Sequence, residues 1–212
     1  DERKKLTKSL KKYAQLKKVE QMSEEEIKKW IQRKLNENYK DIKQDALNLF
    51  IELTGINFNI VSQELEKLML FLGDRPTINK DDVNQIINRS LEQNVFLLTE
   101  FIQKGRKNKA VQLVNDLITM KEEPIKLLAL ITSNYRLYYQ CKILGQKGYS
   151  GQQIAKTVNA HPYRVKLALN QARNYQLNDL LNIIDSCAET DYKLKSSYMD
   201  KQLILELFIL SL

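Results

Sequence analysis

Residues 59–72 read NIVSQELEKLMLFL and are followed directly by Gly73. Apolar side chains recur along this stretch at intervals of three or four residues, which places them on one side of a helix. A glycine after the last apolar residue is a frequent helix end. The stretch therefore predicts an amphipathic helix whose inward side chains are Ile60, Leu65, Leu68, Met69 and Leu72.

Three more short helices are expected on either side of this stretch. Ser23 stands three residues before Glu26, a spacing at which the hydroxyl and the carboxylate can each accept a backbone hydrogen bond at a helix start. The helix that begins there carries Trp30, which we interpret as a core residue rather than a stacking platform. Residues 41–53 continue the helical spacing, and a last short helix is expected from Ile78 onward. Together these patterns predict a small four-helix bundle.

Longer helical patterns follow from residue 94 onward. Pro124 and Pro162 each suit the first turn of a helix, where the missing N–H of proline costs nothing. No alternation of polar and apolar residues persists long enough to predict a strand. The sequence therefore predicts an all-α fold, in which this second part holds helices over residues 95–104, 108–119, 124–144, 150–158, 162–173, 178–192 and 198–212.

Charge divides the sequence into three segments. The net charge is +8, but residues 1–20 hold 8 Lys/Arg and 3 Asp/Glu, residues 21–92 hold 10 and 13, and residues 93–212 hold 16 and 10. We therefore expect two domains, a small helical domain over 21–92 and a larger helical domain over 93–212. Apolar residues at helical spacing before them predict an amphipathic connector over 1–20. The basic flanks suit nucleic acid or an acidic partner, although a solvated lysine-rich surface accounts for them equally well.

No pattern in the sequence supports catalysis or a cofactor. Its glycines form neither of the two common phosphate-binding loops, and Cys141 and Cys187 are too far apart to suggest a zinc site. The single histidine, His161, precedes a proline and is better explained by helix capping or packing than by catalysis or metal binding. We expect no catalytic residue, no metal and no cofactor, and we expect both cysteines to be buried.

The absence of long apolar runs bears on where the protein acts. No stretch approaches the roughly 18 uninterrupted apolar residues that span a membrane, and no signal peptide is recognisable. We therefore expect a soluble, cytoplasmic protein without membrane contact. The sequence opens at Asp1 within a lysine-rich helical pattern, which suggests that it is part of a longer protein.

The order of the two helical units resembles the lid and collar of the delta subunits of bacterial clamp loaders. The stretches that look like the lid of an AAA+ module are residues 23–30, 46–53, 59–72 and 78–83. Those that look like the delta collar are residues 96–101, 110–117, 123–136 and 161–163, together with Asp191, Leu194 and Lys195. The likeness covers almost the whole sequence, and the order of its motifs is specific.

This resemblance implies a non-catalytic role in a bacterial replication complex near the nucleoid. ATP-hydrolysing relatives begin the lid helix with an arginine that senses nucleotide, whereas residues 55–60 read GINFNI and hold none. By the resemblance, the chain would belong to the DNA polymerase III holoenzyme, a nucleotidyltransferase, without catalytic residues of its own. Its partners would be the ATPase and delta-prime subunits, primed DNA and, through an N-terminal domain outside this sequence, the sliding clamp.

Two candidate surfaces lie near the end of the sequence. Tyr198, three positions after Lys195, matches a family position where a collar aromatic meets the end of the DNA template, and a lysine pairs with phosphate. An ordinary tyrosine at a helix start is the alternative. The nearly apolar final helix, with Leu203, Leu207 and Phe208, suggests either an interface between subunits or the centre of the domain.

Two further alternatives concern nucleic acid. The series Tyr135, Arg136, Tyr138, Tyr139 and Lys142 could form a nucleic-acid face, but its spacing runs around a helix, which favours packing. The alternative to the clamp-loader role is a free-standing basic helical domain that binds nucleic acid. Binding by such a domain would weaken steeply as salt rises, whereas binding between protein subunits would persist at high salt.

Overall fold

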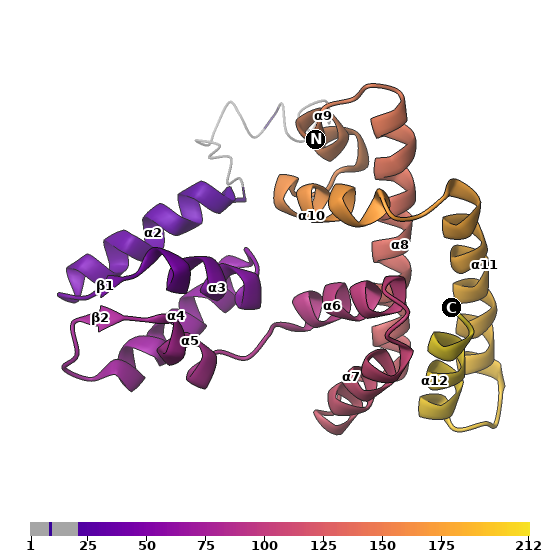
Figure 1. Ribbon diagram of the computed structural model, residues 1–212, viewed down its shortest axis with the longest axis horizontal. Helices are drawn as coiled ribbons and strands as arrows, with labels where there is room; N and C mark the ends of the chain where they lie inside the picture. Colours follow the sequence, from indigo (N-terminus) through magenta and orange to yellow (C-terminus); the bar gives the residue numbers. More distant parts are fainter. Residues whose placement is uncertain (1–8, 10–20) are drawn as a thin grey trace.

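Helices make up nearly all of the regular structure in the computed structural model, which describes residue 9 and residues 21–212. The described residues form eleven α-helices and two strands of two residues each. They are arranged in two units joined by the segment 87–90 (Figure 1). We call α2–α5 with both strands the N-terminal unit, and α6–α12 the C-terminal unit. The all-α prediction is confirmed, whereas the connector expected over 1–20 lies, apart from residue 9, outside the described residues.

The N-terminal unit begins with the predicted helix cap. The Ser23 hydroxyl accepts from the Glu26 backbone N–H at 3.3 Å, and the Glu26 carboxylate accepts from the Ser23 backbone N–H at 2.7 Å. Both bonds satisfy donors that the first turn of a helix leaves without a partner. The elements of this unit are α2 (Glu24–Glu37), β1 (Asp41–Ile42), α3 (Gln44–Thr54), α4 (Phe58–Leu72), β2 (Thr77–Ile78) and α5 (Lys80–Ile86).

The two strands correct the expectation of a chain without strands. β1 and β2 lie parallel with Ile42 beside Ile78, and the Asp41 N–H donates to the Pro76 carbonyl at 2.8 Å. Two residues are too few to show the alternation by which a strand is recognised in a sequence. Residues 41 and 78, at which helices were expected to begin, therefore lie in strands. Helices α3 and α5 begin after them, at Gln44 and Lys80.

The core of the N-terminal unit follows the pattern of residues 59–72 with two adjustments. Leu65, Leu68 and Leu72 are buried as predicted, whereas Val61 takes the inward position expected for Ile60, which is half-buried like Met69. Trp30 is not in the centre of the core. It is half-buried at the edge and packs edge-on against Phe58, with 4.8 Å between the ring centroids.

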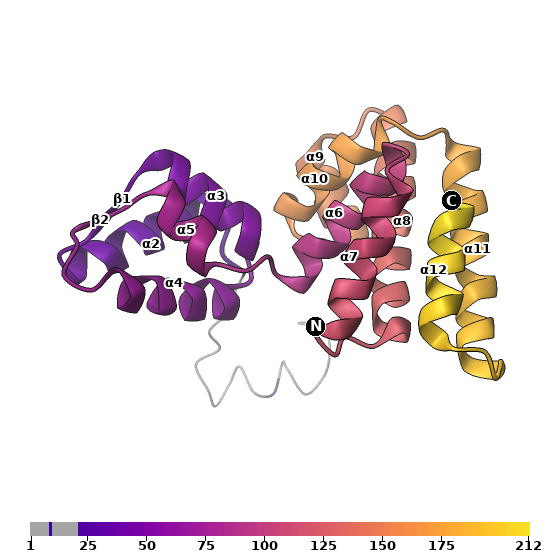
Figure 2. The same ribbon diagram turned by 60° about the horizontal axis from the view of Figure 1, so that its bottom comes forward.

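The C-terminal unit is organised around its longest helix, α8, which lies between the others (Figure 2). Helices α6, α9, α10, α11 and α12 all pack against it. Helix starts again coincide with side-chain caps, because Ser90 opens α6 and Asp200 opens α12. The elements are α6 (Leu91–Gln103), α7 (Lys107–Thr119), α8 (Pro124–Gln146), α9 (Gly151–Val158), α10 (Pro162–Ala172), α11 (Leu177–Ser196) and α12 (Lys201–Ser211).

Aromatic side chains of α8 fill the centre of this unit. Tyr135 and Tyr138 are fully buried, with 5.7 Å between their ring centroids, and Tyr138 shares a 2.8 Å hydrogen bond with the Thr99 hydroxyl. Burial raises the pKa of the Tyr138 hydroxyl well above its usual value, so the side chain stays neutral. The preference for packing over a nucleic-acid face is confirmed for these two tyrosines. Cys141 and Cys187 are buried and unpaired, as expected.

One glycine makes a close contact where the two units meet. Gly55 ends α3 with a φ of +75°, and a Cβ at this position would lie 2.9 Å from the Nε2 atom of Gln93. Gln93 belongs to α6 and is itself buried. Next to this contact, the Ser90 N–H donates to the Leu53 carbonyl at 2.7 Å. The start of α6 is therefore held directly against the end of α3.

We expect Gly55→Ala to destabilise the chain more than Gly73→Ala does. Both glycines have positive φ, a conformation that costs another residue about 1–3 kcal/mol. A Cβ at Gly73 meets nothing within 4 Å, whereas one at Gly55 crowds Gln93, which adds about 1 kcal/mol. Urea unfolding of the two variants measures the difference. Equal losses, or an excess at Gly55 that Gln93→Ala does not relieve, would contradict this account of the contact.

Candidate subunit and DNA interaction surfaces

Helix α12 carries apolar side chains on both its inner and its outer side, and the two sides have different surroundings. Ile204, Leu205 and Ile209 are buried in the core of the C-terminal unit. Phe208 is also in this core at 5% exposure, so it is not on the outer face where an interface between subunits was expected. The helix needs four apolar residues on its inner side to close the unit. Only its remaining apolar side chains are available to another molecule.

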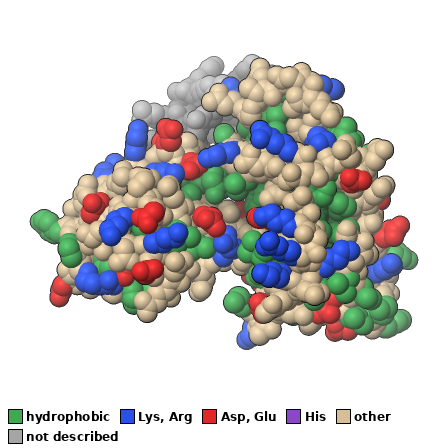
Figure 3. All heavy atoms as spheres, viewed as in Figure 1, with side chains coloured by type: hydrophobic (Ala, Val, Ile, Leu, Met, Phe, Trp, Pro, Cys, Tyr) green, Lys and Arg blue, Asp and Glu red, His purple; other side chains and the backbone are tan. Residues whose placement is uncertain are grey.

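The outer side of α12 carries three exposed leucines. Leu203, Leu207 and Leu210 are 44%, 50% and 45% exposed, and their spacing of four and three residues places them in one row. Hydrophobic side chains gather over α12 and the α11–α12 turn in the space-filling view (Figure 3). Leu203 and Leu207 are therefore exposed to solvent, as residues of a subunit interface would have to be. The sequence pattern did not separate these two residues from Phe208, and the structure adds Leu210 to their row.

Two polar contacts hold α12 in place against α7. The Lys107 ammonium donates to the Leu210 carbonyl at 2.8 Å, near the end of α12 where carbonyl groups lack helical partners. The Gln202 side chain donates to the Asn115 side chain at 3.1 Å. The row of leucines is therefore presented on a helix that α7 holds near both of its ends.

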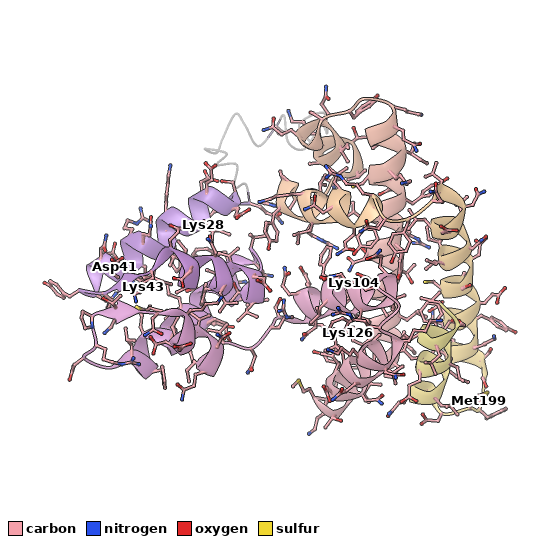
Figure 4. All side chains as sticks on the ribbon, in the orientation of Figure 1. Lys28, Asp41, Lys43, Lys104, Lys126 and Met199 are labelled. Carbon is pink, nitrogen blue, oxygen red and sulfur yellow. The ribbon has the colours of Figure 1, made fainter. Side chains whose placement is uncertain are left out.

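Tyr198 lies in the turn between α11 and α12 and is fully exposed. The expectation of a helix beginning at Tyr198 is wrong, because α12 begins at Lys201, behind the Asp200 cap. Met199 in the same turn lies at the edge of the C-terminal unit, away from the N-terminal unit (Figure 4). The ring of Tyr198 has no neighbour to pack against within the described part of the chain. It is available to stack on another molecule.

Lys195, the second DNA-contact candidate, lies on the last turn of α11 close to Tyr198 in sequence. Its ammonium is 2.6 Å from the Asp191 carboxylate, one helical turn earlier. Both side chains are about half exposed, and such surface pairs contribute little to stability. The ammonium can therefore exchange this carboxylate for a phosphate at small cost.

His161 acts as a helix cap and bridges the two units. Its Nδ1 atom accepts from the Tyr163 backbone N–H at 3.1 Å, so we assign the ring proton to Nε2. Nε2 lies 3.0 Å from the Met22 carbonyl, to which it then donates. Both ring nitrogens are occupied by structural hydrogen bonds. The prediction of a capping role is confirmed.

A cleft of about 1100 Å³ lies between the two units. The start of α4 lines it through Asn57, whose side chain accepts from the Asn59 N–H at 3.1 Å. The opposite wall includes Arg136 and Arg164, which the sequence patterns did not single out for this position.

No group of three or more His, Cys, Asp or Glu side chains in the described part of the chain is arranged to hold a metal ion. Among residues 21–212, no helix combines the length and apolar character that crossing a membrane requires.

The C-terminal unit matches a known protein family, and the chain has relatives among known proteins. Residues 92–212, more than half of the chain, match the family described as DNA polymerase III delta subunit, C-terminal domain. The whole chain is 40% identical to DNA polymerase III subunit delta of Bacillus subtilis, of which it covers 61%. Over 90% of its length it is 24% identical to a probable DNA polymerase III subunit delta of Aquifex aeolicus, of which it covers 55%.

A solved structure extends the match to three dimensions. The Bacillus subtilis DNA clamp loader delta protein superposes with a TM-score of 0.83 at 40% identity, over 100% of this chain and 62% of the other. The chain thus spans about three fifths of the length of these Bacillus relatives. The family resemblance seen in the sequence is confirmed: the chain belongs to the DNA polymerase III delta family, whose C-terminal domain it contains.

Proposed function

We propose that the chain holds a delta subunit in the bacterial clamp loader through the outer side of α12, and so supports loading of the sliding clamp onto primed DNA. The observation that carries this proposal is the row of exposed leucines on α12, a helix that α7 holds in place; the row comprises Leu203, Leu207 and Leu210. Family membership and the printed names of the relatives support it. The complex would act in the cytoplasm, at the replicating DNA.

Burial of the leucine row would favour assembly. Removing a leucine side chain from water stabilises a contact by about 1.5–3 kcal/mol when burial is complete. Because the three leucines are already about half covered, each can contribute only part of this. Exposed apolar patches of this kind mark protein interaction sites. The ATPase and delta-prime subunits are the partners we propose for this surface.

The role we propose is non-catalytic. Residues 55–60, which lead into α4 and form its start, hold no arginine, and the Asn57 side chain caps the helix. A helix start without a cation has no strong electrostatic link to a nucleotide phosphate. We therefore propose that residues 21–92 act as an AAA+ lid-like domain that does not sense ATP, and that residues 93–212 act as the collar. The clamp would be bound by a part of the delta protein outside this chain.

DNA contact is the finer part of the proposal, and it concerns the α11–α12 turn. Tyr198 offers a fully exposed ring, and Lys195 offers an ammonium whose present partner is a surface carboxylate. An aromatic ring stacks on any base face, and a lysine pairs with a neighbouring phosphate. We propose that these two residues meet the end of the DNA template in the assembled complex.

Replacing two leucines of α12 by charged residues tests the assembly role. We expect Leu203→Glu/Leu207→Glu to weaken co-assembly with the ATPase and delta-prime subunits about tenfold or more, because each substitution places a carboxylate in a desolvated contact. Size-exclusion chromatography with light scattering at moderate salt measures the complex. Leu70→Glu is the matched control, since Leu70 is exposed on α4 in the other unit. Normal assembly by the double variant would refute the proposed interface.

Replacing Tyr198 tests the DNA contact separately from assembly. In the complete clamp loader, we expect Tyr198→Ala to weaken primer-template binding about 5- to 100-fold through loss of stacking, with an unchanged salt dependence. Fluorescence anisotropy with a labelled primer-template measures the affinity. Tyr39→Ala is the control, because Tyr39 is almost as exposed but lies in the N-terminal unit. Equal affinities for the two variants would remove Tyr198 from the DNA contact.

A further inference from the structure

Helices α9 and α10 form a helix-turn-helix unit. Three residues, Asn159, Ala160 and His161, separate them, which is the turn length typical of this motif. Asn159 has the left-handed conformation, with φ of 51° and ψ of 45°, that reverses the chain after the first helix. The Ala160 N–H then donates to the Ala155 carbonyl at 3.0 Å and closes the turn.

The inner side of this unit has the packing that the motif requires. Ile154, Val165 and Ala168 are fully buried, and Ala155 is nearly so. The small side chains of Ala155 and Ala168 leave room for two helices to approach closely. Both helices also pack against α8, which fixes their geometry. The unit is therefore a rigid element of the C-terminal unit rather than a pair of loosely joined helices.

In DNA-binding proteins with this motif, the N-terminal part of the second helix enters the major groove. The matching side chains are those of His161, which caps α10, and of Tyr163, Lys166 and Leu167 within it, and here they contact the N-terminal unit. Tyr163 is only 9% exposed because the core of that unit surrounds it, and Leu167 packs against the same core. The His161 ring donates to the Met22 carbonyl. The N-terminal unit therefore covers Tyr163 and partly covers His161 and Leu167, whereas the Lys166 side chain stays largely exposed.

The covering segment is acidic at the point where a phosphate would lie. Glu24 in the first turn of α2 accepts from the Lys166 ammonium at 3.2 Å and from Lys28 at 2.8 Å. Burial by itself would raise the pKa of the Glu24 carboxyl, but the hydrogen bonds and charges of Lys28 and Lys166 outweigh it and lower the pKa. The carboxylate is therefore ionised at neutral pH, as a phosphate would be.

A groove of about 830 Å³ separates α2 from the helix-turn-helix unit beside this ion pair. One wall carries Lys156 and Lys166, and the other carries Glu24 and Glu25. Lys166 is 65% exposed even while paired, so its ammonium is open to exchange with solvent anions. The polar contacts that join the start of α2 to α10 include the His161–Met22 hydrogen bond and the Lys166–Glu24 ion pair, so displacement of α2 from α10 would break both.

We propose that α9–α10 is a duplex-DNA-binding helix-turn-helix whose recognition face is covered by the start of α2, so that Glu24 and DNA phosphates compete for Lys166. This goes beyond the clamp-loader role, because it needs no partner protein. The N-terminal unit would hold this DNA-binding face closed in the conformation described. Its displacement would open a second DNA contact, distinct from that of Tyr198.

Weakening the cover tests the competition. In the full chain, we expect Glu24→Gln to bind a labelled duplex about threefold more tightly than Glu66→Gln, measured by fluorescence anisotropy at low salt. The two substitutions change the net charge equally, and Glu66 is exposed on α4. Circular-dichroism melting checks that both variants remain folded. Equal affinities would overturn the proposal and leave the α10 face as a docking surface for the N-terminal unit only.

A second variant checks that the added binding uses α10. In the Glu24→Gln background, we expect Lys166→Ala to reduce the slope of log affinity against log salt by about one, the contribution of one phosphate contact. Lys109→Ala, an exposed lysine on α7, is the matched control and should leave the slope unchanged. Equal slopes for the two lysine variants would also overturn the proposal. Neither measurement depends on assembly, so the clamp-loader role stands or falls separately.

Discussion

Burial of the apolar side of α8 is the constraint on which the C-terminal unit depends. Leu127, Ile131, Tyr135 and Tyr138 lie within one band of this helix and are inaccessible to solvent. Each large apolar side chain buried in this way contributes about 1.5–3 kcal/mol, whereas the surface ion pairs contribute at most about 1 kcal/mol each. The Thr99 hydroxyl on α6 forms a hydrogen bond with the Tyr138 hydroxyl, so burial leaves this polar group paired. Five helices pack on α8 because together they exclude water from it.

This constraint also explains why α12 has exposed leucines. Closing the unit requires only the inner side of α12, with Phe208 and Ile209 among its buried residues. The helix is nevertheless apolar on its outer side, where Leu203 and Leu207 remain half exposed. Exposed apolar side chains that lie in one row are typical of protein interaction sites. The proposed subunit interface on α12 rests on this row of leucines.

Helix α10 connects the two units because its side chains contribute to both cores. Val165 is buried against α8, whereas Tyr163 is surrounded by the core of the N-terminal unit. His161 at the start of the same helix uses one ring nitrogen to cap α10 and the other to reach Met22. A change in the position of the N-terminal unit would therefore act directly on α10. The N-terminal unit is therefore in direct contact with the helix-turn-helix unit, and the proposed competition for Lys166 depends on this contact.

Local patterns in the sequence determined the helices, their caps and the family to which the chain belongs. Ser23 with Glu26 marked a helix start, and Pro124 and Pro162 marked two more, because capping depends on residues within one helical turn. Tertiary contacts decided the rest. The pairing of Ile42 with Ile78, the burial of Phe208 rather than Leu207, and the insertion of Tyr163 into the other unit all depend on residues distant in the chain. Spacing alone cannot tell which side of an all-apolar helix will be covered, since that depends on which neighbours the fold brings against it.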